Sequence, residues 1–219
     1  MSSLFHPLVL LIGSALEILH QLTGAVGLHS YGFAIILLTV LVKGFLYPLT
    51  AKQVRSMKEM QAIQPQMKKL QEQYKNNPQL MQQKIAELYK ESGVNPLAGC
   101  LPLLIQMPIL MGMFYTLQGF EYAGEPSFLW LPSLSHPDPY YILPILSAAT
   151  TWFQSKQTAS ESNSQMKIML IFMPLFIGWI SLKFASGLVL YWVTMNLVQI
   201  AQQWWMYRHD TREKGKEAA

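Results

Sequence analysis

The protein has 219 residues, of which 51% are hydrophobic and only 13% are charged. Soluble domains carry about twice that share of charged residues, so the composition and the recurring long apolar stretches predict a membrane protein. The formal net charge of +4 is concentrated in a few segments, which indicates membrane topology rather than sequence-specific nucleic-acid binding. A lone cysteine, Cys100, excludes an intramolecular disulfide and a cysteine-based metal site.

The first segment, residues 1–29, has an apolar stretch that is long enough to cross a membrane. However, Ser14, Glu17 and Gln21 are spaced three and four residues apart, with His20 beside them. A polar face of this kind favours a helix that lies in the outer membrane interface. We therefore expect an external interfacial helix, with a spanning helix as the alternative.

Five further segments approach the roughly 20 apolar residues needed to cross a hydrocarbon core. The two shortest, 139–156 and 167–184, contain Pro144 and Pro174, and membrane helices tolerate proline where neighbours satisfy the backbone. The five expected spans are residues 30–50, 96–118, 139–156, 167–184 and 186–206.

The lysines and arginines between these spans fall almost entirely on one side. They lie in 51–95, at the borders of the short loop 157–166 and in the tail 207–219, whereas 1–29 and the loop 119–138 have none. Because basic loops stay in the cytoplasm, this asymmetry predicts an external N-terminus and a cytoplasmic C-terminus.

Residues 51–95 differ from the spans because they are polar, charged and helix-favouring. Apolar residues recur there at coiled-coil spacing, then Asn76, Asn77 and Pro78 interrupt the helix before a shorter apolar repeat follows. This pattern predicts a cytoplasmic hairpin of two antiparallel helices. The apolar repeats are Met60, Ile63, Met67, Leu70 and Tyr74, followed by Met81, Ile85 and Leu88.

Lys43 is unusual because it lies within an apolar span, where a charge costs roughly 3 kcal/mol on insertion scales. The lysine side chain could extend toward the cytoplasmic interface, or it could face a hydrated cavity. Other spans carry polar side chains that favour the cavity, although each alone is ordinary hydrogen bonding between helices. They are Thr39 on the face of Lys43, Gln106, the group Ser147, Thr151 and Gln154, and the stripe Trp192, Asn196, Gln199 and Gln203.

The sequence contains no paired carboxylates, phosphate-binding loop, nucleophile elbow or metal-ligand spacing. We therefore expect neither an enzyme nor a bound cofactor. From the residues alone, three functions remain open. These are a hydrated groove that admits polar segments of other proteins, a small anion channel or transporter with Lys43 in its pathway, and a scaffold that recruits cytoplasmic proteins.

Several strings, in this order and spacing, resemble the YidC family of membrane protein insertases from about residue 31 to residue 208. The most specific is the run ELYKESGVNPLAGCLPLLIQMPI at 87–109. The others are KGFLYPLT at 43–50, IQP at 63–65, DPYYILPIL at 138–146, KIMLIFMP at 167–174 and SGLVLYW at 186–192.

The resemblance implies an all-α membrane protein with five transmembrane helices around a hydrophilic groove that is open to the cytoplasm. It implies insertion of nascent membrane proteins, alone or with the Sec translocon and without nucleotide hydrolysis, in a bacterial cytoplasmic membrane. Lys43 takes the position of the family's basic groove residue, where arginine is usual, and residue 185 is alanine where proline is usual. The whole corresponds to a compact form without the large external domain of some relatives.

The expected site residues follow from the polar residues in the apolar spans and from the family resemblance. The groove is expected to include Lys43, Thr39, Gln106, Asn196 and Gln199, and the resemblance places the surface along which substrate slides at Tyr191 or Trp192. The resemblance also associates the hairpin with ribosome or targeting-receptor contacts, although its basic residues could equally face solvent and anionic lipid headgroups. The lysines chosen for that contact are Lys68, Lys69, Lys75 and Lys84. We expect the protein to act as a monomer.

Overall fold

The computed structural model describes residues 2–95, 101–118, 120, 122, 127–158 and 164–217. These residues form eight helices, which confirms the prediction of an all-helical protein. In chain order the helices are α1 (Ser2–Ala25), α2 (Tyr31–Phe45), α3 (Tyr47–Gln73), α4 (Pro78–Glu91), α5 (Leu101–Gln118), α6 (Ile142–Thr158), α7 (Ser164–Ser181) and α8 (Ser186–Glu217).

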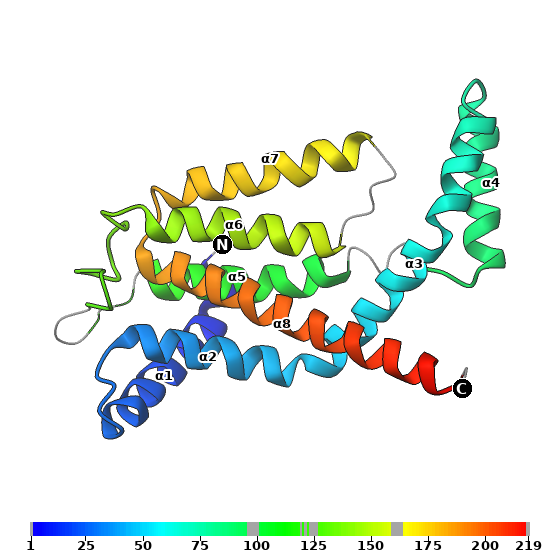
Figure 1. Ribbon diagram of the computed structural model, residues 1–219. Helices are drawn as coiled ribbons and strands as arrows, with labels where there is room; N and C mark the ends of the chain where they lie inside the picture. Colours follow the sequence, from blue (N-terminus) through cyan, green and yellow to red (C-terminus); the bar gives the residue numbers. More distant parts are fainter. Residues whose placement is uncertain are drawn as a thin grey trace.

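Five helices, α2, α5, α6, α7 and α8, run side by side as a bundle (Figure 1). α8 is central because it packs against α2, α5 and α6, whereas α7 packs on α6 at the periphery. The α3–α4 hairpin projects from one end of the bundle, called the hairpin end below, and the segment 127–141 lies at the opposite end, called the loop end. α8 continues to Glu217, well beyond the expected span 186–206.

Burial is concentrated at the loop end. The fully buried apolar side chains include Leu16, Ile35, Leu117, Leu131 and Leu134, which come from α1, α2, α5 and the segment 127–141. α4, in contrast, contains no buried residue. The bundle is therefore closed by packing at its loop end, and α4 lies outside the packed core.

The N-terminal helix α1 packs against both α2 and α5. Its residues Ile12, Leu16 and Leu19 are buried, and the ring of His20 stacks on Tyr31 at a centroid distance of 3.7 Å. The residues of its polar face, Ser14, Glu17 and Gln21, are exposed. The exposed side of α1 also carries Leu10, Leu11, Ile18 and Leu22, and the depth of α1 in a membrane stays a prediction.

The end of α2 departs from a single straight span over 30–50. α2 ends at Phe45, and the chain turns by 65° before α3 continues. Pro48 contributes to this break because it has no N–H to donate to the carbonyl of Gly44, as a continuous helix would require, whereas the first turn of α3 tolerates it. With 15 residues at about 1.5 Å each, α2 is about 22 Å long, and Lys43 lies in its last turn.

Length and hydropathy mark one segment of the described helices as able to cross a membrane alone, His6–Ala25 of α1. α2 and α3 meet the same criterion only as a bent pair, and Leu170–Ser181 of α7 is apolar but shorter. The expected span 96–118 begins in residues 96–100, which lie outside the described residues. The five-span topology accordingly stays a prediction.

Replacing Gly32 by alanine is expected to lower the free energy of unfolding by about 1–3 kcal/mol, the usual cost of overpacking a core. A Cβ at Gly32 would overlap the ring of Phe128, which is itself buried. The matched control is Gly44→Ala in the same helix, where a Cβ meets nothing within 4 Å and alanine favours the helix by up to about 1 kcal/mol. Unfolding in mixed detergent micelles, followed by circular dichroism, measures both variants; equal stabilities would contradict the expected contact.

Candidate functional site

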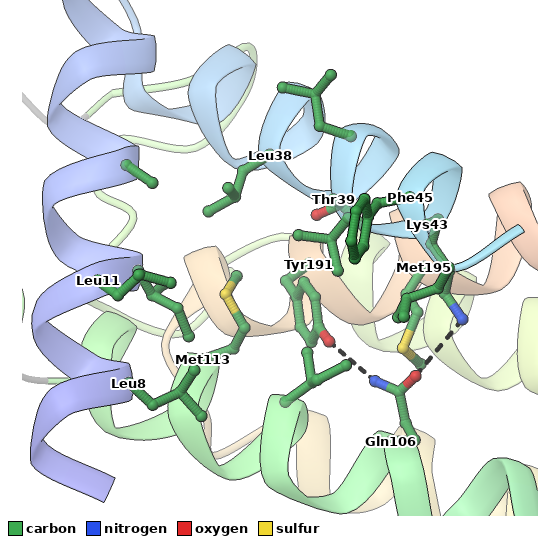
Figure 2. Close-up of a pocket in the computed structure, with 16 residues that line it drawn as sticks. Leu8, Leu11, Leu38, Thr39, Lys43, Phe45, Gln106, Met113, Tyr191 and Met195 are labelled. Atoms are coloured by element: carbon green, nitrogen blue, oxygen red, sulfur yellow. Dashed lines mark hydrogen bonds between the residues drawn. The ribbon is translucent and has the colours of Figure 1, made fainter. Parts of the chain in front are cut away.

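A cavity of about 430 Å³ lies between α1, α2, α5 and α8. Its walls are almost entirely apolar, and Figure 2 shows Lys43, Gln106 and Tyr191 grouped at one side of it. The side chains of α1 and α5 that line it include Leu8, Leu11, Ile12, Ala15, Ile109 and Met113.

The polar side chains at the cavity form hydrogen bonds that connect three helices, with Gln106 in the middle. The Nζ of Lys43 on α2 donates to the Oε1 of Gln106 on α5 at 3.5 Å and to the Oε1 of Gln199 on α8 at 3.0 Å. The Nε2 of Gln106 donates in turn to the hydroxyl oxygen of Tyr191 on α8 at 3.0 Å. These contacts fix the orientation of the Gln106 amide and join the polar groups of α2, α5 and α8 (Figure 2).

The charge of Lys43 is not neutralised by its partners, because both are amide oxygens. An ammonium group has three donors, and two of them are used by Gln106 and Gln199. Its backbone carbonyl accepts a further bond from the Nε2 of Gln202 at 3.1 Å, which ties the end of α2 to α8. Within the described residues, the cavity thus holds a cation with hydrogen bonds but no carboxylate beside it.

Thr39 lies one helical turn before Lys43 and also lines the cavity. Its side chain is buried, and its hydroxyl donates to the carbonyl of Ile35 at 2.6 Å. The hydroxyl proton is therefore occupied within α2, while the oxygen can still accept a hydrogen bond. The structure brings Thr39, Lys43 and Gln106 together at the cavity, and Gln199 joins them through its bond with Lys43.

Asn196 occupies a different place from the one expected. It is completely buried against α6, where its Nδ2 donates to Thr150 at 3.2 Å and to Thr151 at 3.0 Å. Trp192 faces the same helix and donates from Nε1 to Thr151 at 3.0 Å. Neither residue lines the cavity. The polar stripe of α8 is divided because Asn196 and Gln199 point about 60° apart around the helix, so Asn196 meets α6 and Gln199 meets Lys43 on α2.

The two residues expected on the sliding surface are separated in the same way. Tyr191 is buried and lines the cavity, whereas Trp192 contacts α6. Successive residues on a helix point about 100° apart, so neighbouring positions 191 and 192 cannot share one face. The structure therefore associates Tyr191, and not Trp192, with Lys43.

The hairpin lysines lie away from the cavity, on α3, α4 and their connection (Figure 1). Lys68, Lys69 and Lys75 are exposed. Lys84 pairs with Glu87 at 2.6 Å on the surface of α4, and the hydrogen bond with Glu87 raises the pKa of Lys84. Three of the four lysines are thus presented to solvent, and the fourth already has an acidic partner.

The sequence did not predict that α1 forms one wall of the cavity. Leu8, Ile12 and Ala15 fall on one helical face. This spacing predicts that the face is buried, but it does not predict which helices pack against it. The contact of Gln202 with the backbone of Lys43 was also not predicted. A side chain bonded to a backbone carbonyl leaves no sequence pattern that could reveal it.

Comparisons of this chain with known proteins agree with one another. The family model described as 60Kd inner membrane protein matches residues 21–214. A membrane protein insertase YidC of Clostridium perfringens is 42% identical, with 99% of this chain and 97% of the relative covered. The YidC of Francisella tularensis subsp. novicida is also 42% identical, but the match covers 87% of this chain and only 34% of that longer protein.

A solved structure has the same fold. The crystal structure of an active YidC insertase with its first transmembrane domain resolved is 31% identical, matches 91% of this chain and 45% of its own, and has a TM-score of 0.68. Sequence, family model and fold therefore agree over most of the chain, and the protein belongs to the YidC family of 60Kd inner membrane proteins.

Proposed function

We propose that this protein is a membrane protein insertase that moves polar segments of nascent membrane proteins across a bilayer and releases their apolar segments into lipid. The observation that carries the proposal is the cavity cation: Lys43 lies among four helices, and its ammonium group donates to the neutral amides Gln106 and Gln199. The membership of the YidC family supports it, because the relatives compared above are named as insertases.

The proposed topology places the hairpin end in the cytoplasm and the loop end outside. Eight lysines and arginines lie in the segment 51–95, and none lies in the segment 119–138. Such an asymmetry orients membrane proteins with the basic segments inside. The proposed spans are those expected from the sequence, with the first divided by the bend after Phe45 and the fifth continuing as the long α8.

The proposed mechanism lowers a barrier without consuming nucleotide. A polar group that crosses hydrocarbon without a hydrogen-bond partner costs several kcal/mol. A groove that is open at the hairpin end shortens this crossing, and Lys43 attracts acidic groups of the crossing tail. Partition of the apolar segment into lipid, worth roughly 0.8 kcal/mol for each buried CH₂ group, then drives insertion.

The proposed partners are nascent membrane proteins and the ribosomes that synthesise them. Lys68, Lys69 and Lys75 are exposed on the hairpin, where they can meet the phosphates of ribosomal RNA. A targeting receptor could use the same surface, and cooperation with the Sec translocon is included in the proposal on the strength of the family resemblance.

Insertion by the purified protein is the direct test. Liposomes that contain only this protein, with its hairpin end outward and without nucleotide, receive a single-span client with a short acidic tail. We expect the tail to become resistant to external protease, well above the level in empty liposomes. Equal protection in empty liposomes would contradict the proposal, and anion flux without protection would support the channel alternative instead.

A further inference from the structure

We propose that the cavity beside Lys43 binds one anionic phospholipid, with its headgroup at Lys43 and an acyl chain between α1, α2 and α5. The lipid would occupy the cavity while no client is bound. Lipid binding itself goes beyond the insertase function, whereas this role as a placeholder rests on the function proposed above.

The walls of the cavity suit a hydrocarbon chain. Its volume of about 430 Å³ lies within the range of roughly 300–1,000 Å³ that is typical of ligand sites. The cavity is lined by Leu8 and Ile12 of α1 and by Ile109 and Met113 of α5. Against these walls an acyl chain leaves no polar group without a hydrogen-bond partner.

The polar side of the cavity suits an anion. Lys43 keeps a third donor after its bonds to Gln106 and Gln199, and these neutral amides leave its positive charge uncompensated. A phosphate oxygen would accept the remaining donor in a charge-assisted hydrogen bond, which is stronger than a neutral one. A zwitterionic lipid offers the same phosphate but carries a cation that Lys43 would repel.

The cavity is accessible from the side that a membrane would cover. Three apolar side chains on its border are exposed: Leu11 by 67%, Leu41 by 53% and Phe45 by 85%. Lys43 lies only two residues before the end of α2, about 3 Å along the helix axis. Since the chain bends by 65° immediately afterwards, a headgroup can reach Lys43 without passing along a full-length helix.

Photolabelling tests the proposal in vesicles that contain the purified protein and no client. The probe is a phosphatidylglycerol with a diazirine at the end of one acyl chain, and labelled peptides are identified by mass spectrometry. We expect labelling of the α1 and α5 walls near Ile12 and Met113, with competition by unlabelled phosphatidylglycerol. Phosphatidylcholine should compete much less, because it lacks the net negative charge.

Two variants separate the headgroup contact from the chain contact. Lys43→Met should reduce wall labelling about tenfold, which corresponds to one charge-assisted hydrogen bond of about 1.4 kcal/mol. Ala15→Phe should reduce it by filling the cavity while the charge remains. The matched control is Lys183→Met, because Lys183 lies over Trp179 at 5.0 Å and not at the cavity. Circular dichroism and thermal unfolding confirm that each variant is folded.

The proposal is overturned if the walls are labelled no more than the exposed face of α7 near Leu175, which represents bulk lipid contact. Equal labelling by a phosphatidylcholine probe would also overturn it. The two proposals fail separately, because photolabelling needs no client. If the cavity walls are labelled but no client is inserted, the lipid site is supported and the insertase function is contradicted. If clients are inserted but the walls are not labelled, the insertase function is supported and the lipid site is contradicted.

Discussion

Replacement of Lys43 by alanine is expected to lower insertion of a client with an acidic tail by tenfold or more, which corresponds to about 1.4 kcal/mol or more in the barrier. Lys43 is bonded to two neutral amides, so its charge is available to an acidic group that passes the cavity. Lys43→Arg keeps this charge and should retain most of the activity, although the planar guanidinium alters the geometry. Protease protection in liposomes measures all three proteins.

Two controls separate the charge of Lys43 from general damage. A client whose tail is neutral should be inserted almost equally by Lys43→Ala and the unmodified protein. Lys183→Ala removes a lysine that lies over Trp179 and should insert both clients normally. If Lys43→Ala lost the acidic and neutral clients equally, the residue would serve the packing of Gln106 and Gln199 rather than the attraction of acidic tails.

The candidate site was predictable where polar residues are rare. Lys43, Gln106 and Gln199 stand out in apolar spans, and since unpaired polar groups in a membrane are costly, their convergence follows from the sequence. The structure joins these three residues by hydrogen bonds. Asn196 is also a polar residue in an apolar span, yet it pairs with Thr150 and Thr151 on α6. Several helices carry polar side chains that could pair with it, so the sequence does not determine which helix it meets.

The cavity wall formed by α1 was not predictable for a related reason. The buried face of α1 follows from its apolar spacing, but an apolar face packs on any apolar surface, and the hydrophobic effect is not directional. The contact depends on shape instead: Gly112 on α5 lets Leu8 and Ile12 approach so closely that a Cβ at Gly112 would lie within 3 Å of both side chains. Such complementarity becomes visible only in three dimensions.

The hairpin shows how local patterns succeed when only one partner is available. The apolar repeat that includes Ile63 and Met67 predicts that α3 packs on the next helix, and Tyr89 on α4 donates to the sulfur of Met67 at 3.5 Å. With two helices there is a single seam, so the sequence determines the pairing. Burial in the two hairpin helices is limited to α3, which also contacts α8, whereas α4 packs mainly on α3 and has no buried residue.

The loop end depends on one carboxylate, and Asp138→Ala is expected to lower the free energy of unfolding by about 3 kcal/mol. Asp138 is buried, and its oxygens accept hydrogen bonds from the backbone of Leu143 at 2.7 Å and of Tyr140 at 3.0 Å. The indole Nε1 of Trp130 donates to it at 3.4 Å. Alanine removes three bonds, which contribute about 1 kcal/mol each, including the one that caps the start of α6.

Asp138→Asn tests whether the stability depends on the hydrogen bonds that the carboxylate accepts, because asparagine has nearly the same shape. Asparagine keeps one side-chain oxygen as an acceptor and replaces the other by a donor that faces N–H groups, so about half of the loss is expected. Unfolding in mixed micelles measures the free energies, and Trp130 fluorescence reports the local contact. The loop end has other hydrogen bonds nearby: the backbone N–H and the hydroxyl of Ser186 both donate to the carbonyl of His136, at 2.8 Å and 2.6 Å. If Asp138→Ala were as stable as the unmodified protein, these bonds would be sufficient to hold the loop end without the carboxylate.

The expected loss of stability instead identifies Asp138 as the group that fixes where α6 begins. It therefore also determines how Thr150 and Thr151 of α6 meet α8.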